Sequence, residues 1–212
     1  MYEVQVISIT YNDVMGEHKQ RSYTARGADT RRRIRATAME LFRDREYGDV
    51  TVSELAEAAG EYPNQITYHF GSKDALYIDA AFGLLLRDTE RLRKAGQRAS
   101  TPDTLRAVLA RTALTMPSTT AIVSALALAR GNPAVQPSVE TSLSLLFRQS
   151  ERFLEGVQEE RGWTTDQDLG RAVKTFWSAA FGAVLISQAG YPGGPSSVDV
   201  AATLSFRPAD EG

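Results

Sequence analysis

The chain has 212 residues, of which 42% are hydrophobic, and its formal net charge is −2. That length suffices for one ordinary core, or for a small domain plus a medium one. The absence of cysteine excludes disulfides, thiolate catalysis and cysteine-ligated zinc. No run of about 18 apolar residues and no basic-then-apolar leader is present, so we expect a cytoplasmic protein without a membrane span.

Residues 1–25 are predicted to form a flexible arm. Residues 1–10 alternate loosely between apolar and polar types, but a lone strand has no partner in an otherwise helical chain. Residues 11–25 are polar and carry Lys19 and Arg21. An arm of this kind can reach into a DNA minor groove, and an inert disordered leader accounts for the composition equally well.

The first long helix is expected to begin at a cap formed by Asp29 or Thr30 and to end near Arg45. Its apolar residues recur at the spacing of one buried face, and its early arginines are expected to point outward. Between residues 17 and 45 the chain has nine basic and four acidic residues, although it is negative overall. Beside a nucleic-acid-binding motif, such a stripe indicates a phosphate-binding face; without one, it is a solvated helix surface.

Residues 51–73, TVSELAEAAGEYPNQITYHFGSK, predict two short helices and the start of a third. Thr51 can cap the first helix, and Gly60 follows it where a left-handed backbone is needed. Pro63 suits the first turn of the second helix, in which Ile66 and Phe70 give one buried side. Two short helices joined by a glycine turn match a helix-turn-helix unit, and a helical corner in an unrelated fold is the alternative.

The second helix of such a unit enters the DNA major groove. Asn64 and Gln65 can pair with an adenine edge, and Thr67 can touch a thymine methyl group. The remaining candidates for contacts with phosphate oxygens are Tyr68, His69 and Lys73.

Ala56, Gly60, Ile66 and the run Tyr68-His69-Phe70-Gly71-Ser72-Lys73 resemble the DNA-binding domain of the TetR family of transcriptional regulators. The resemblance extends over residues 26–86 or so. It implies that Tyr68, His69 and Lys73 contact phosphates, that Thr51 touches the DNA backbone, and that residues 63–67, including Pro63, face bases. The chain departs from the usual pattern at Glu61, Tyr62, Asn64 and Thr67, so base specificity cannot be copied from a relative and one common phosphate contact is missing.

The remaining helices are predicted from caps and breakers in chain order. Their expected ranges are 73–98 after a Ser72 cap, 102–115 up to the Met116-Pro117 break, 118–130 with a buried core from Ala121, 137–161 ended by Gly162, and 165–189 after a Thr165 or Asp166 cap. Residues 196–212 are predicted to be a loosely ordered tail with at most one short turn. The predicted fold is all-α, with a helix-turn-helix DNA-binding domain at 26–72 and a helical effector-binding and dimerisation domain at 73–195.

The last long helix is apolar over so wide an arc that a second surface should cover it, and a second subunit is the simplest cover. The resemblance implies the same, since the last two long helices of TetR regulators usually form a four-helix bundle between subunits. The predicted interface residues are Phe153, Trp177, Phe181, Val184 and Leu185. A central core helix in a monomer is the alternative.

Small residues in the second domain can leave room for a ligand between helices. The candidate lining residues are Thr115, Met116, Gln149, Phe176 and Trp177, each of which also fits ordinary core or interface. Few charged residues fall within the apolar stripes, which favours a neutral or weakly polar effector.

Nothing in the sequence predicts an enzyme, a metal or a cofactor. The only histidines are His18 and His69, which rules out a site with two histidines within one motif. Asp166 and Asp168 are explained by a helix start, and a catalytic pair is the less favoured alternative.

We therefore expect a TetR-like regulator, by family default a repressor, that binds double-stranded operator DNA as a homodimer and is released by a small-molecule effector. The alternative is a helical small-molecule or protein-binding dimer without operator-specific DNA binding.

Overall fold

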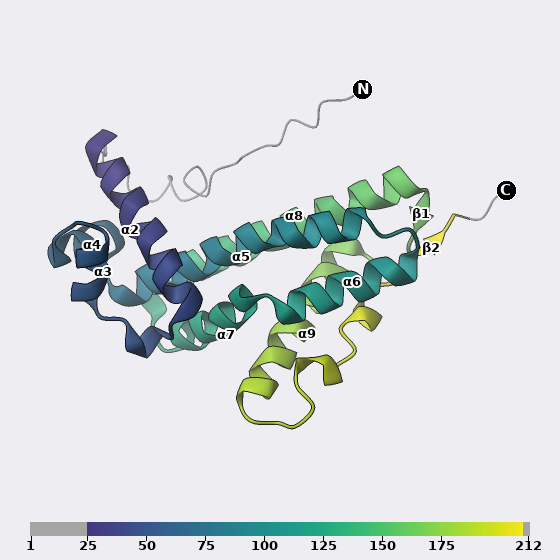
Figure 1. Ribbon diagram of the computed structural model, residues 1–212. Helices are drawn as coiled ribbons and strands as arrows, with labels where there is room; N and C mark the ends of the chain where they lie inside the picture. Colours follow the sequence, from purple (N-terminus) through teal and green to yellow (C-terminus); the bar gives the residue numbers. More distant parts are fainter. Residues whose placement is uncertain (1–24, 210–212) are drawn as a thin grey trace.

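The computed structural model describes residues 25–209, and the fold is all-α (Figure 1). The helices and strands are α2 Ala25–Asp44, η1 Tyr47–Asp49, α3 Val52–Ala58, α4 Pro63–Phe70, α5 Lys73–Gln97, α6 Pro102–Thr115, α7 Pro117–Arg130, η2 Pro133–Val135, α8 Gln136–Arg161, β1 Trp163–Thr164, α9 Leu169–Gln188, η3 Pro195–Ser197, η4 Ala201–Thr203 and β2 Arg207–Pro208. The predicted arm lies outside the described residues except for Ala25.

The helices form two units joined by α5. α2, α3 and α4 lie together at one end of the molecule, and α5 runs out of that unit alongside α8 (Figure 1). α5 packs against α2 and α4 on one side and against α6, α7 and α8 on the other. Its residues 76–85 are all buried, because helices of both units cover every face of this stretch. The two units therefore share one helix and one continuous core.

α2 begins earlier than predicted. The expected caps, Asp29 and Thr30, lie inside the helix, which starts at Ala25. The Asp29 carboxylate instead accepts hydrogen bonds from Arg32 and Arg33. The Asp29 carboxylate oxygens therefore pair with side chains of the same helix and do not cap its first turn.

Arg35 points inward, contrary to the prediction that it lies on the outer face. Its Nε donates to Asp79 Oδ2 on α5 at 2.7 Å, and the side chains retain 22% and 7% of their exposure. A Cβ on Gly83 would lie 2.7 Å from Arg35 Nη2, so the absence of a side chain there makes room for the guanidinium. The pair thus fixes α2 against α5 inside the core.

The helix-turn-helix connection forms as its sequence predicts. Thr51 caps α3 through a capping box in which Glu54 N donates to Thr51 Oγ1 and Thr51 N donates to Glu54 Oε2. Gly60 has φ of +66°, and the amide of Glu61 donates to Ala56 O across the turn. Pro63 occupies the first turn of α4.

Two details of the second unit differ from expectation. α7 is not buried all round, since Ser124 and Ala127 are exposed. α9 is capped by Asp168, whose Oδ1 accepts from Arg171 N at 2.7 Å, rather than by Thr165 or Asp166. Asp166 pairs instead with Arg207 near the C-terminus.

Residues 196–209, the described part of the predicted tail, are packed rather than loose. Val200, Leu204 and Phe206 are buried at 1–7% exposure against the second unit, and β2 pairs antiparallel with β1. The Gln167 side chain accepts from Ser205 N at 2.8 Å. Val200 and Leu204 are four residues apart and Leu204 and Phe206 two apart, so the three follow no single helical or strand period and their burial has no clear sequence signal.

Among the described residues, α9 is the one single helix whose length and mean hydropathy, 1.2, fit a membrane span. α6 and α7 meet the same test only as a pair, and they are bent by 62° at their junction. α9 packs against α6, α7 and α8, so a place in the protein core accounts for its apolar composition.

Asp79→Ala should lower the free energy of unfolding by about 3 kcal/mol, because it removes the carboxylate that pairs with the largely buried Arg35 guanidinium. Chemical denaturation measures the loss. Asp103→Ala is the matched control, since its ion pair with Arg106 involves an 84% exposed carboxylate and should contribute little. Equal losses in the two variants would contradict a special role for the buried pair.

Candidate nucleic-acid interface

α4 presents a row of exposed side chains on the side opposite its buried residue. Ile66 is 1% exposed and anchors the helix in the core. Pro63, Asn64 and Thr67 are exposed, Gln65 is half-buried, and Tyr68 is 58% exposed. Tyr62, just before the helix, is 78% exposed. The structure therefore brings Pro63, Asn64 and Thr67 together on one exposed face of a short helix, with Gln65 at its half-buried edge.

Thr51 lies at the exposed start of α3. Its Oγ1 accepts from Glu54 N and also donates to Glu54 Oε2 at 2.8 Å. The hydroxyl is thus held in place by the capping box, and an oxygen acceptor on DNA would compete with Glu54 for its proton.

His69 is buried, although the sequence predicted an outward position. It is 7% exposed, and its ring meets the Tyr68 ring edge-on at 4.9 Å between centroids. Burial lowers the pKa of His69, and the positive charge of Arg31 lowers it further. At neutral pH the imidazole is neutral, so it can reach a phosphate only as a neutral N–H donor and after a side-chain movement.

Lys73 is bound within the protein. Its Nζ donates to Tyr47 O at 2.7 Å and lies 4.0 Å from the centre of the Tyr47 ring. The Tyr47 hydroxyl donates to Asp74, and burial together with this bond raises the pKa of Tyr47 to about 12. Lys73 therefore supports the start of α5, and its remaining donors are the ones available for a phosphate.

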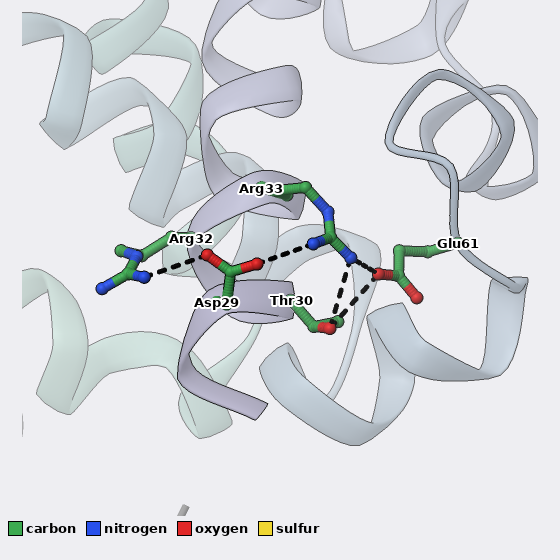
Figure 2. A network of polar contacts seen from close by, with 5 residues as sticks. All are labelled: Asp29, Thr30, Arg32, Arg33 and Glu61. Carbon is green, nitrogen blue, oxygen red and sulfur yellow. Dashed lines mark hydrogen bonds and ion pairs between the residues drawn. The ribbon is translucent and has the colours of Figure 1, made fainter. Parts of the chain in front are cut away.

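Glu61 joins the turn before α4 to the start of α2 (Figure 2). Arg33 forms an ion pair with Glu61, and Thr30 Oγ1 donates to Glu61 Oε1 at 3.2 Å. Asp29 holds the other side of Arg33 at 2.7 Å and also pairs with Arg32 at 2.9 Å. Two of the basic residues that the sequence assigned to the phosphate-binding face are therefore partly neutralised by acidic neighbours.

Arg31, a member of the predicted basic stripe, is a further candidate for this interface, although the sequence did not predict its contact with α4. Its guanidinium carbon lies 4.7 Å from the centre of the Phe70 ring, which places the charge beside the end of α4. No sequence spacing connects the two residues, because the contact joins separate helices.

The predicted ligand-lining residues differ in their burial. Thr115 and Gln149 are exposed, and Thr115 Oγ1 donates to Arg111 O at 2.9 Å within its own helix. Met116, Phe176 and Trp177 are buried at 4%, 5% and 2% exposure as core residues.

Most of the predicted dimer residues are used within the subunit. Phe153 packs against Gly96, where an added Cβ would lie 2.7 Å from the Phe153 ring. Trp177 Nε1 donates to Ser150 Oγ at 3.0 Å. Phe181 and Val184 are buried at 9% and 3% exposure. Leu185 is the member of the predicted set that stays largely exposed, at 52%, because it lies past the part of α9 that its own subunit covers.

Two protein families match the chain. Residues 34–80 match the family described as "Bacterial regulatory proteins, tetR family", and residues 102–205 match the one described as "Bacterial transcriptional repressor C-terminal". No curated protein sequence matches the chain significantly.

Solved structures share the fold over most of the chain. A protein from Rhodococcus sp. RHA1 assigned as a transcriptional regulator is 28% identical, with a TM-score of 0.68, and the match covers 82% of this chain and 92% of that one. Thermus thermophilus FadR, a TetR-family repressor solved with lauroyl-CoA, is 25% identical with a TM-score of 0.54, covering 82% and 88%. A regulator from Saccharomonospora viridis solved with choline is 17% identical with a TM-score of 0.56, covering 83% and 94%, and shows the fold alone.

Glu61→Gln should strengthen binding to DNA of any sequence several-fold, because it removes a negative charge from this face and leaves Arg33 with one carboxylate partner, Asp29, instead of two. The slope of log affinity against log salt should steepen by about 0.9 for one additional phosphate contact. Glu57→Gln, at an exposed position of α3, is the matched control for the loss of charge alone. Weaker binding by Glu61→Gln would show instead that the ion pair is needed to hold α4 in place.

Acidification should destabilise the protein through His69. The unfolded chain takes up a proton near the ordinary histidine pKa of about 6.5, whereas the folded pKa is lowered. The contribution of neutral His69 to the free energy of unfolding is therefore complete above the unfolded pKa, and it is lost as the pH falls through the folded pKa. Melting temperatures between pH 5.5 and 7.5 should fall more for the native chain than for His69→Gln, and parallel curves would contradict this assignment.

Proposed function

Because the chain belongs to the TetR family of bacterial regulatory proteins, we propose that it binds operator DNA as a homodimer and releases it when a small molecule binds its second unit. The observation that carries the proposal is the exposed face of α4. Asn64, Thr67 and Tyr68 project from this face, and Ile66 anchors the other side of the helix in the core. A short helix that packs one side against the core and exposes polar side chains on the other suits the major groove.

In this proposal the residues divide into two groups by the part of DNA they meet. Asn64, Gln65 and Thr67 face base edges, where amide groups pair with adenine and a methyl group meets thymine. Thr51, Tyr68, His69 and Lys73 position the helix on phosphates, and the ring of Pro63 packs on the groove wall.

A second subunit would complete the apolar surface at the end of α9. Leu185, Ile186 and Tyr191 are 52%, 47% and 63% exposed and lie close together in sequence. Covering them with the same patch of a second copy gives a two-fold dimer. The two α4 helices would then read half-sites roughly 34–36 Å apart, or at a wider spacing set by the dimer.

Release would follow from a population shift. An effector lowers DNA affinity only if it prefers a conformation whose α4 spacing does not fit the operator. The neighbours solved with lauroyl-CoA and with choline support a small-molecule ligand, and the match to a repressor C-terminal family supports repression. We place this cycle in the cytoplasm, where operator DNA is found.

The first experiment is a titration of the purified protein onto DNA from upstream of its own gene, at two salt concentrations, with random DNA for comparison. Sequence-selective binding with a steep salt dependence is the expected result. Equal affinity for every upstream fragment and for random DNA would contradict the proposal.

Three variants then test the division of roles on the operator. Gln65→Ala should cost about 1–3 kcal/mol and relax preference at one base pair. Lys73→Ala should weaken binding to all sequences and flatten the salt slope by about one unit. Since Lys73 also bonds Tyr47, Tyr68→Phe is a cleaner probe of phosphate contact, as its hydroxyl lies on a 58% exposed side chain. Equal effects on operator and random DNA from Gln65→Ala and Tyr68→Phe would contradict the assignment.

A further inference from the structure

A hollow of about 330 Å³ lies where the first unit meets the second, between α2, α5 and the start of α7. Its polar lining consists of Arg43 from α2, Arg87, Asp88 and Arg91 from α5, and Ser118 from α7. Its size falls at the lower end of the range for small-molecule sites. None of the residues predicted from sequence to line a ligand site belongs to it.

The lining of this hollow carries more positive than negative groups. Three guanidinium groups face one carboxylate, that of Asp88. Outside the lining, Glu40 Oε2 lies 2.6 Å from Arg43, Asp44 Oδ2 lies 3.1 Å from Arg43, and Glu40 Oε1 lies 3.2 Å from Arg87. These two carboxylates hold Arg43 and Arg87 in position and offset part of the positive charge. Arg91 is the least engaged of the three, because its Nε lies 3.8 Å from Asp88 and its side chain is 71% exposed.

Ser118 adds a buried hydroxyl that lacks a partner. Its residue is 2% exposed, and its Oγ has no hydrogen-bond partner among the described residues. A buried hydroxyl left unpaired is destabilising, so an acceptor on a ligand would relieve that cost. Ser118 also lies in the first turn of α7, a helix of 14 residues, where the helix dipole favours an anion.

Apolar groups complete the lining. Phe42, Leu84 and Ala121 face the same hollow as the arginines. An inorganic ion would leave this surface without a partner, whereas an anion carried on a short apolar group would cover it.

We propose that this hollow binds a small organic anion, a carboxylate or phosphate on a compact apolar group, and that its occupancy changes the affinity for DNA. The second half of the proposal rests on the proposed function. The ligand class differs from the neutral or weakly polar effector that the sequence suggested, because the arginines come from two helices and lie outside the apolar stripes.

The position of the hollow explains how an occupant could act on DNA binding. A ligand held by Arg43 and Ser118 would connect α2, which carries the DNA-binding unit, to α7 in the second unit. Tyr77 on α5 already joins these elements, since its hydroxyl donates to Ala121 O at 3.2 Å and its ring meets Phe42 at 4.7 Å. A ligand that fits only one spacing of α2 and α7 would therefore select one conformation.

The binding test uses the purified full chain without DNA. Acetate, benzoate, octanoate and phenyl phosphate are titrated by calorimetry and thermal shift, with benzamide as the neutral counterpart of benzoate and inorganic phosphate as the bare anion. We expect saturable binding of at least one organic anion and none of benzamide. Arg91→Gln should weaken that binding about tenfold or more, and Ser118→Ala several-fold. Arg148→Gln, an exposed arginine on α8, should leave it unchanged.

Saturable binding by none of the four organic acids, or equal binding by the native chain and Arg91→Gln, would overturn the site. Binding of inorganic phosphate as tightly as the organic acids would overturn the apolar part of the assignment. These results do not depend on whether the chain binds an operator.

The coupling is tested separately on the operator. A bound acid should change operator affinity at least several-fold in the native chain and not in Arg91→Gln. Saturable binding with unchanged operator affinity would overturn the coupling while leaving the site in place. Failure to find any operator would count against the proposed function alone, because the calorimetric result stands without it.

Discussion

The Arg35–Asp79 ion pair is the contact on which the arrangement of the two units depends. It lies inside the core that α2 and α5 share, at 2.7 Å, and Gly83 leaves the room it needs. Two charges withdrawn from water must find each other, so the pair tolerates one register of α2 along α5. Because α3 and α4 pack on α2 and α5, that register also sets where the reading helix projects from the rest of the molecule.

The same polar side chains hold the DNA-binding unit together and face its ligand. Lys73 supports Tyr47, Thr51 caps α3, and Arg33 is tied to Glu61 across the turn before α4. These contacts pre-order the surface, which reduces the conformational entropy lost on binding. In the proposed complex they would also compete with phosphate for the same donors, so affinity for DNA would depend on how readily each internal partner is exchanged.

Local features were read correctly from the sequence because their causes are local. The Thr51 cap, the left-handed Gly60, the Pro63 start, the Ser72 cap and the end of α8 at Gly162 each depend on residues within one turn of each other. The helix order and the all-α class followed from them. The inward position of Arg35, the burial of His69 and the packed tail did not, since each depends on a residue far away in the chain.

The sequence by itself determined the helix-turn-helix unit, its exposed reading face and the family to which the chain belongs, because these depend on short-range spacing and on one specific run of residues. Only the tertiary structure decided which charged side chains pair within the protein and where the hollow between the two units lies. The hollow between α2, α5 and α7 draws its arginines from separate helices, and most of the apolar face of α9 is consumed by its own subunit. The hollow and the burial of α9 both depend on packing between segments that are distant in the sequence, so no local sequence pattern predicts either.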